Sequence, residues 1–263
     1  MAHKDVTTQF MNHSTTKLYT AHIIAEEDLI FSGSPIIEYI FKQHSTKQHI
    51  SDGRPCKAGD YIYTITAPAR TLLSYERIIL NLIQRLCGIT TLTAKYVQTL
   101  NSHTIKILDT RKTTPGLRLF EKYAVQIGGG YNHRMNLYDG LMIKDNHLTI
   151  IDDLEVFFHS LYQQHPTIKT QIEIDNFSQL KKLIRGNIKI NAILLDNMDT
   201  KETLQCVQYI TRTLPHCFIE ISGGINLQNI NQYRETGVHG ISIGALTHQA
   251  TSKNIKLEFQ HGK

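Results

Sequence analysis

The sequence predicts an α/β protein in which a mixed N-terminal region precedes a β/α barrel with parallel strands. Six short β-branched runs, separated by helical stretches, begin near residues 104, 141, 171, 192, 217 and 240. Near-continuous apolar runs joined by helical crossovers are typical of parallel strands. A polar residue or a glycine lies at or near the C-terminal end of each run. In a barrel these ends open onto one face, where catalytic groups collect.

The first hundred residues combine strand and helix patterns. TKLYTAHIIA alternates as a strand, and Ser34-Pro35 predicts a helix cap with proline at the first helical position. DGRPCKAGDYIYTIT predicts a turn followed by a strand. LLSYERIILNLIQRL has helical spacing, and TTLTAKYVQTL predicts a second helix after Gly88. We therefore expect an N-terminal α+β domain over 1–101, joined by the C-terminal segment 250–263, and a barrel domain over 102–249.

Composition narrows the classes of protein that this chain can represent. The net charge is +5, but Lys and Arg are scattered, so we expect no nucleic-acid partner. The N-terminus lacks the apolar core of a signal peptide, and no apolar run is long enough to cross a membrane. Four widely spaced cysteines predict incidental thiols in a reducing compartment: Cys56, Cys87, Cys206 and Cys217. We expect a cytoplasmic protein without a membrane partner.

Cationic side chains gather in two segments of the barrel region. DTRKTTPGLR places Arg111 and Lys112 beyond a strand, where a solvated strand exit is the alternative interpretation. After a triple glycine, His133 and Arg134 form a second pair, and Lys144 follows the next strand. Adjacent cations are costly to hold together without an anion, and the planar fork of Arg binds carboxylate or phosphate through two hydrogen bonds. These residues predict a site around something small and highly anionic.

Glycines and carboxylates occupy the remaining strand ends. Ser222-Gly223-Gly224 and Gly244 follow the last two strands, where exposed backbone N–H groups are typical of a phosphate site. Glu173 and Asp196 lie on adjacent predicted strands. They are either counter-charges for the cations, or they stabilise positive charge on a sugar or hold a phosphate-bound metal ion. No ligand spacing typical of zinc occurs.

Several of these segments resemble a known family. DTRKTTPGLR, EKYAVQIGGGYNHRMNLYDGLMIKDNH, EID, LLDN, SGG and IGALTH are similar to nicotinate-nucleotide pyrophosphorylase, also called quinolinate phosphoribosyltransferase. The resemblance runs from DVTT at residues 5 to 8 through the last strand. Family members usually carry a helix and an acidic-Gly segment before DVT, whereas four residues precede it here, and every matched catalytic position is retained.

The resemblance implies an N-terminal α+β sandwich-like domain, an incomplete β/α barrel and a homodimer with its active sites between subunits. It implies a pentosyltransferase that joins phosphoribosyl pyrophosphate to quinolinate with decarboxylation, using Mg²⁺. Implied quinolinate-binding residues are Arg77 (entering the neighbouring site), Thr110, Arg111, His133, Arg134 and Lys144. Implied catalytic residues are Lys112, Lys144, Glu173 and Asp196. Implied phosphoribosyl pyrophosphate contacts are Lys112, Lys144, Glu173, Asp196, Ser222, Gly223, Gly224 and Gly244, with Mg²⁺ near the two carboxylates and held through water.

Three other functions stay open at this stage. A sister phosphoribosyltransferase would act on nicotinate or another small acid, although we expect such relatives to alter the His-Arg pair that is intact here. A Schiff-base aldolase would use Lys144 as its nucleophile. Such a lysine needs an apolar setting without nearby cations in order to lose its proton. Repulsion from neighbouring cations can also favour the free amine, so this alternative is not removed. A non-enzymatic nucleic-acid binder is the third.

Overall fold

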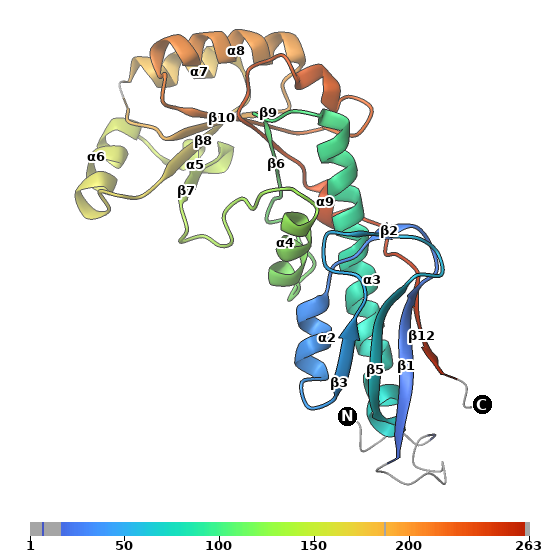
Figure 1. Ribbon diagram of the computed structural model, residues 1–263. Helices are drawn as coiled ribbons and strands as arrows, with labels where there is room; N and C mark the ends of the chain where they lie inside the picture. Colours follow the sequence, from blue (N-terminus) through green and yellow to red (C-terminus); the bar gives the residue numbers. More distant parts are fainter. Residues whose placement is uncertain (1–6, 8–16, 187, 261–263) are drawn as a thin grey trace. The chain divides into compact units, whose positions relative to one another are not determined.

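The computed structural model describes Thr7 and residues 17–186 and 188–260 (Figure 1). The DVTT segment, where the resemblance begins, lies outside the described residues except for Thr7. The chain forms two compact units. The first takes the described residues up to Ala94, Phe120–Gly129 and the described residues from Gln249 onwards, and the second takes Lys95–Leu119 and Gly130–His248.

The first unit is built on an antiparallel sheet with the strand order β12-β1-β5-β3. Its strands are β1 (Leu18–Ala25), β3 (Ser45–Gln48), β5 (Tyr61–Pro68) and β12 (Ile255–Phe259), and β2 (Leu29–Ile30) pairs separately with β4 (Pro55–Cys56). Alternate residues of β1 and β5 enter an apolar core that includes Ile23 and Ile65. The two strands predicted in this region are therefore confirmed, and the C-terminal strand β12 pairs with β1.

The helix α2 (Ser34–Ile40) begins one residue earlier than a Ser34 cap requires. Its N-cap is Gly33, with φ 136°, and Ser34 is already helical, so the predicted cap is wrong by one position. The Asp52 carboxylate accepts hydrogen bonds from the backbone N–H groups of Gly33 at 2.9 Å and Ser34 at 3.1 Å. An acceptor from a distant part of the chain thus does the work that a local cap would do.

A single helix, α3 (Ala69–Leu100), replaces the two helices predicted on either side of Gly88. This expectation is wrong because glycine does not break the helix here. A Cβ atom at Gly88 would lie 2.2 Å from the carbonyl oxygen of Thr251. Glycine is therefore required so that another backbone segment can pass against the helix surface.

The triple glycine ends α4 (Arg118–Ile127) and has two separate uses. A Cβ atom at Gly128 would lie 2.7 Å from the carbonyl oxygen of Thr90, so this glycine allows a close approach to α3. Gly129 has φ 86°, the left-handed conformation that commonly ends a helix. Both uses agree with the close approach and tight turn that three successive glycines predict.

The second unit contains a parallel sheet with the strand order β6-β11-β10-β9-β8-β7. Its strands are β6 (Lys106–Leu108), β7 (Leu141–Ile143), β8 (Thr170–Ile174), β9 (Ala192–Asp196), β10 (Phe218–Ser222) and β11 (Gly240–Ser242). Its helical segments are α5 (Asp145–Ile150), α6 (Leu154–Gln164), α7 (Phe177–Arg185), α8 (Thr200–Thr213), η2 (Ile230–Tyr233) and α9 (Ala245–His248). All the predicted parallel strands are confirmed, with helices between most of them (Figure 1).

The sheet forms an incomplete barrel whose edge strands are β6 and β7. The segment that precedes β7 runs along β6, because Tyr131 donates its N–H to Ile107 O at 2.8 Å and accepts from Asp109 N at 3.0 Å. On the other strands, Ser222 is in register with Asp196 on one side and Ser242 on the other. The C-terminal strand ends therefore lie level with one another at one edge of the sheet.

The four cysteines lie in the core, as the expectation of incidental thiols implies. The four cysteines are free and buried, and burial raises the pKa of the Cys56, Cys87 and Cys206 thiols to about 12. They are therefore unreactive thiols in the core. Among the described helices, none combines the length and the apolar character that a membrane crossing requires.

Candidate functional site

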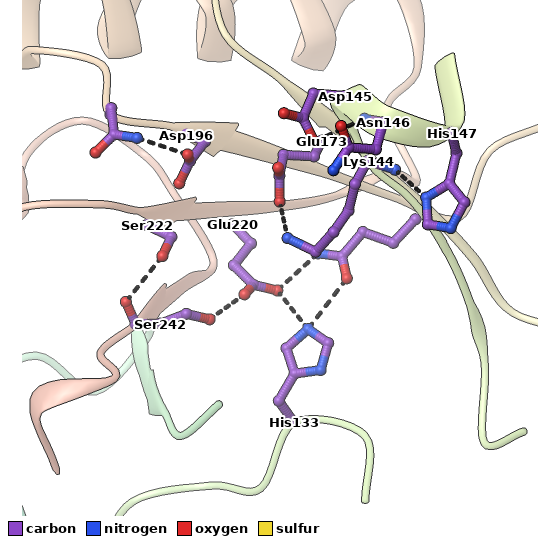
Figure 2. A network of polar contacts seen from close by, with 12 residues as sticks. His133, Lys144, Asp145, Asn146, His147, Glu173, Asp196, Glu220, Ser222 and Ser242 are labelled. Atoms are coloured by element: carbon purple, nitrogen blue, oxygen red, sulfur yellow. Dashed lines mark hydrogen bonds and ion pairs between the residues drawn. The ribbon is translucent and has the colours of Figure 1, made fainter. Parts of the chain in front are cut away.

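Polar residues occupy the level strand ends of the second unit, as the sequence predicts. Asp109 follows β6, Lys144 follows β7, and Asp196 and Ser222 are the last residues of β9 and β10. Glu173 lies one residue before the end of β8. Figure 2 shows Lys144 and Glu173 directed toward each other, with the Asp196 and Ser222 side chains beyond them. The structure thus brings the predicted carboxylates and Lys144 to one edge.

Two guanidinium groups, one from the loop after β6 and one from the loop before β7, influence each other at this edge. Burial lowers the pKa of Arg134, and repulsion from Arg111 lowers it further, while Asp139 opposes both effects. Arg134 donates from Nη1 to Gly140 O at 2.9 Å. The buried Nε of Arg111 has no hydrogen-bond partner among the described residues. An anion with planar oxygens would satisfy that donor and relieve the repulsion.

Lys112 lies beside the glycine that follows the last strand of the sheet. Thr247 donates its hydroxyl to Lys112 O at 2.7 Å, and Lys112 N–H donates to Thr110 Oγ1 at 3.0 Å. A Cβ atom at Gly244 would lie 3.1 Å from both Lys112 Cδ and His248 Nε2. Two predicted phosphate-binding positions therefore meet, and His248 joins them. Sequence reasoning missed His248, although it lies in IGALTH, four residues after the glycine on one helical turn.

Arg118 connects the two cationic loops and was also missed. Its guanidinium donates from Nε to Thr113 Oγ1 at 3.2 Å and from Nη1 to Met135 O at 3.2 Å. Between Arg111 and Arg118 the chain makes a tight turn, in which Gly116 has φ 79°. The only sequence signal was the presence of Arg118 at the end of DTRKTTPGLR, with nothing to separate it from a surface arginine.

The carboxylates occupy a more balanced electrostatic environment. Lys144 Nζ and Glu173 Oε2 are 2.5 Å apart, and the Glu173 side chain is only 10% exposed. Burial raises the pKa of Asp196, and the nearby Lys144 and Lys112 partly oppose that rise. Asn197 donates from its side chain to Asp196 Oδ2 at 2.6 Å. Glu173 is therefore paired directly with a cation, and the charge of Asp196 is partly offset by two.

The Ser222-Gly223-Gly224 loop requires glycine for steric and conformational reasons. Gly223 and Gly224 have φ 90° and φ 62°, in the left-handed region. A Cβ atom at Gly223 would lie 2.1 Å from Asn197 Oδ1. Asn197 N–H in turn donates to Ser222 O at 2.9 Å. This loop is consequently locked to the end of β9 beside Asp196.

A second polar layer lies deeper in the barrel. His133 Nε2 is 3.1 Å from Gln171 Oε1, and Gln171 donates from Nε2 to Glu220 Oε2 at 2.8 Å (Figure 2). Sequence reasoning identified His133 but missed the other two. Their signal was alternation, because residues two apart on a strand face the same side. Gln171 precedes Glu173 by two positions, and Glu220 precedes Ser222 by two.

Arg77 lies in the first unit, on α3, with its side chain 69% exposed. Its guanidinium is 3.5 Å from Glu76 Oε1 on the same helix. The described residues come from one chain, so the expected insertion of Arg77 into a neighbouring subunit's site stays a prediction.

The donor set fits the way in which Mg²⁺ is usually bound. The described residues contain no group of three or more His, Cys, Asp or Glu side chains that could hold a metal ion alone. Glu173 and Asp196 nevertheless supply carboxylate oxygens at adjacent strand ends. Magnesium typically takes one or two carboxylates, waters and substrate phosphates, so such a pair suits it without a dedicated cage.

Together, the incomplete barrel and its cation-rich edge define a β/α-barrel enzyme for small polyanions. The family model described as "Quinolinate phosphoribosyl transferase, N-terminal domain" matches residues 5–87, and the corresponding C-terminal domain model matches residues 89–258. The chain belongs to the quinolinate phosphoribosyl transferase family. The family resemblance given by the sequence motifs is thereby confirmed.

Individual relatives agree with this assignment over most of their length. A probable nicotinate-nucleotide pyrophosphorylase [carboxylating] of Bacillus subtilis (strain 168) is 40% identical over 244 residues, which cover 90% of this chain and 82% of the relative. A nicotinate-nucleotide pyrophosphorylase [carboxylating] of Mycobacterium leprae is 33% identical, covering 97% and 90%. The crystal structure of nicotinate-nucleotide pyrophosphorylase from Ehrlichia chaffeensis has a TM-score of 0.89 at 34% identity, covering 97% of this chain and 92% of the other.

Proposed function

We propose that this protein transfers the phosphoribosyl group of phosphoribosyl pyrophosphate to the ring nitrogen of quinolinate. The products are nicotinate mononucleotide, pyrophosphate and carbon dioxide, as in the biosynthesis of NAD. The observation that carries this proposal is the repulsive pair of Arg111 and Arg134, with a buried Arg111 Nε that has no hydrogen-bond partner in the described part of the chain. Quinolinate, with two adjacent carboxylates on a planar ring, is a complementary anion for these donors.

The cations account for substrate binding. Arg111 and Arg134 hold the carboxylates of quinolinate, with Lys144 and His133 beside them. Lys112 contacts the pyrophosphate, while the Ser222-Gly223-Gly224 loop and Gly244 present backbone N–H groups to phosphate oxygens. Holding two polyanions side by side requires this positive charge, because it cancels their mutual repulsion and fixes the nitrogen near the reacting carbon.

The carboxylates account for the sugar chemistry. As pyrophosphate leaves, positive charge develops on the ribose ring, and Glu173 and Asp196 stabilise it. Glu173 and Asp196 would hold Mg²⁺, which when bound would supply positive charge to offset the phosphates of the substrate. After transfer the ring nitrogen is a positively charged pyridinium, which stabilises the electron pair left on the adjacent ring carbon when its carboxylate departs as carbon dioxide. A proton from solvent then adds to that carbon. The substrate ring thus serves as its own electron sink.

The assembly and location belong to the same proposal. We propose a cytoplasmic homodimer in which Arg77 completes the quinolinate site of the partner subunit. The exposure of Arg77 on α3 supports this arrangement, because an arginine held in its own chain's site would be covered. A mixture of two inactive variants, Arg77→Ala and Glu173→Ala, should regain about a quarter of wild-type activity through mixed dimers with one intact site. Failure to regain activity in verified mixed dimers would contradict the exchange.

The direct test is incubation with quinolinate, phosphoribosyl pyrophosphate and Mg²⁺, with carbon dioxide and pyrophosphate measured in the same reaction. We expect both products in equal amounts and none without Mg²⁺. Nicotinate in place of quinolinate is the control, and turnover of nicotinate instead would identify a sister transferase. Release of neither product with quinolinate would refute the proposed function. The Lys144–Glu173 ion pair leaves the aldolase alternative without support, and borohydride trapping should give no adduct on Lys144.

A further inference from the structure

A chain of hydrogen bonds beneath the strand ends has a fixed direction. Glu220 is 2% exposed and Gln171 is 8% exposed. The Glu220 carboxylate accepts from Ser242 Oγ and from Gln171 Nε2, and its Oε2 atom also lies 3.5 Å from His133 Nε2 (Figure 2). Because an ionised carboxylate only accepts hydrogen bonds, it requires the NH₂ side of the Gln171 amide to face it. Glu220 therefore determines which way the Gln171 amide points.

That orientation is passed on to His133. With its NH₂ group toward Glu220, Gln171 presents its carbonyl oxygen to His133 Nε2 at 3.1 Å. An amide oxygen only accepts, so the Nε2 atom must carry the hydrogen. On the other side of the ring, Arg134 donates its backbone N–H to His133 Nδ1 at 2.7 Å. Both contacts require the same neutral tautomer, with hydrogen on Nε2 and none on Nδ1.

We infer that Glu220 and Gln171 are positioning residues that hold His133 in the Nε2–H tautomer and thereby hold Arg134 in place for its anionic substrate. The backbone N–H of His133 also donates to Asp109 Oδ1 at 2.8 Å, which fixes the position of the backbone just before Arg134. In the opposite tautomer, a ring N–H would face the Arg134 N–H, and their hydrogen bond would be lost. The part that concerns Arg134 and its substrate rests on the proposed function, whereas the tautomer does not.

Two variants of Glu220 separate this role from packing and from charge. Glu220→Leu keeps a similar volume but removes the acceptor, so nothing sets the direction of Gln171. Glu220→Gln removes the charge, but its side-chain oxygen can still accept from Gln171 while its NH₂ donates to Ser242. We therefore expect the leucine variant to lose control of the tautomer and the glutamine variant to keep it.

The first readout is the protonation of each His133 ring nitrogen, observed by ¹⁵N NMR at mildly alkaline pH. The His133→Asn variant identifies the His133 signals by difference. The wild-type protein should show a hydrogen on Nε2 and none on Nδ1, and so should Glu220→Gln, whereas Glu220→Leu should show a mixture. A wild-type ring with hydrogen on Nδ1, or on both nitrogens, would overturn the inference without reference to any variant.

The second readout is the Michaelis constant for each substrate. Supporting groups around a binding side chain commonly contribute about tenfold or more, so Glu220→Leu should raise the quinolinate KM by roughly tenfold. The KM for phosphoribosyl pyrophosphate should change by less than about twofold in both variants, as should the quinolinate KM of Glu220→Gln. Equal defects in both variants would assign a charge role, and no defect in either would assign packing, so each result overturns the inference. An inactive wild-type protein would instead refute the proposed function and leave the NMR result standing.

Discussion

The two sides of the strand-end site differ in how their charges are balanced. In the loops that follow β6 and precede β7, Arg111 and Arg134 repel each other, and the Arg111 Nε has no partner among the described residues. On the β7 to β9 side, Lys144 and Glu173 form an ion pair, and cations partly offset the burial of Asp196. The first side is preorganised for an anion that must be brought in. The second already carries both signs of charge, which suits a charge that develops only during the reaction.

Substitution of Arg134 should have the largest effect. Hydrogen bonds to charged groups contribute about 1.5–3 kcal/mol each, so loss of a two-point contact should lower kcat/KM for quinolinate by about 10²–10⁴-fold. Arg134→Ala should raise KM and reduce turnover while the fold is retained, because removing one of two repelling cations does not destabilise the protein. Steady-state kinetics measure the change in KM and turnover, and thermal unfolding measures whether the fold is retained.

The exposed Arg212 on α8 provides a matched control for Arg134. Arg212→Ala removes the same charge from the second unit but lies on a helix rather than at a strand end, so its kinetics should equal those of the wild type. Unchanged kinetics in Arg134→Ala would mean that the repulsive pair is not the quinolinate site.

Glu173→Ala should have the next largest effect, and the effect should fall on turnover. A group that stabilises only the developing charge contributes little to substrate binding, so kcat should fall by about 10²-fold with a smaller change in KM. Glu155→Ala, on the solvent-facing α6 helix, is the control for loss of a carboxylate. A raised KM with normal turnover would show that Glu173 binds substrate and does not act on the transition state.

Gly223→Ala tests the phosphate loop through stability as well as activity. Its positive φ and the clash with Asn197 should together cost about 2–4 kcal/mol of unfolding free energy and raise the KM for phosphoribosyl pyrophosphate. Gly59→Ala is closely matched, because Gly59 has φ 93° but open space where a Cβ atom would lie. The Gly59→Ala substitution should lower the free energy of unfolding by only about 1 kcal/mol and leave the kinetic constants unchanged. If denaturant titrations showed the same loss of unfolding free energy in Gly223→Ala and Gly59→Ala, the clash with Asn197 would be contradicted.

The sequence predicted what depends on local pattern, and missed what depends on contacts between distant segments. Apolar runs with polar ends predicted the position of every parallel strand in the sheet, because local spacing indicates where a strand begins and ends. They also predicted which residues lie at the C-terminal strand ends. The pattern around Gly88 predicts a helix boundary, because nothing in the sequence shows that Thr251 passes against this glycine. Gln171 and Glu220 were missed for the same reason, because a buried polar residue is explained only by its partners.

The pH dependence of stability should show the smallest effect. Burial raises the folded-state pKa of Asp196 above its ordinary value of 3.8, so the folded state binds this proton more tightly than the unfolded chain does. The stability cost of ionised Asp196 therefore grows as the pH rises above the unfolded-state pKa, is complete above the folded-state pKa, and disappears at lower pH. Asp196→Asn should raise Tm by about 1–2 °C at pH 8, with a difference that shrinks as the pH falls toward 4, while activity is lost. A lower Tm than that of the wild type at pH 8 would show that attraction to Lys144 and Lys112 outweighs burial. The carboxylate would then be a structural counter-charge, and the contrast between the two sides of the site would lose half of its basis.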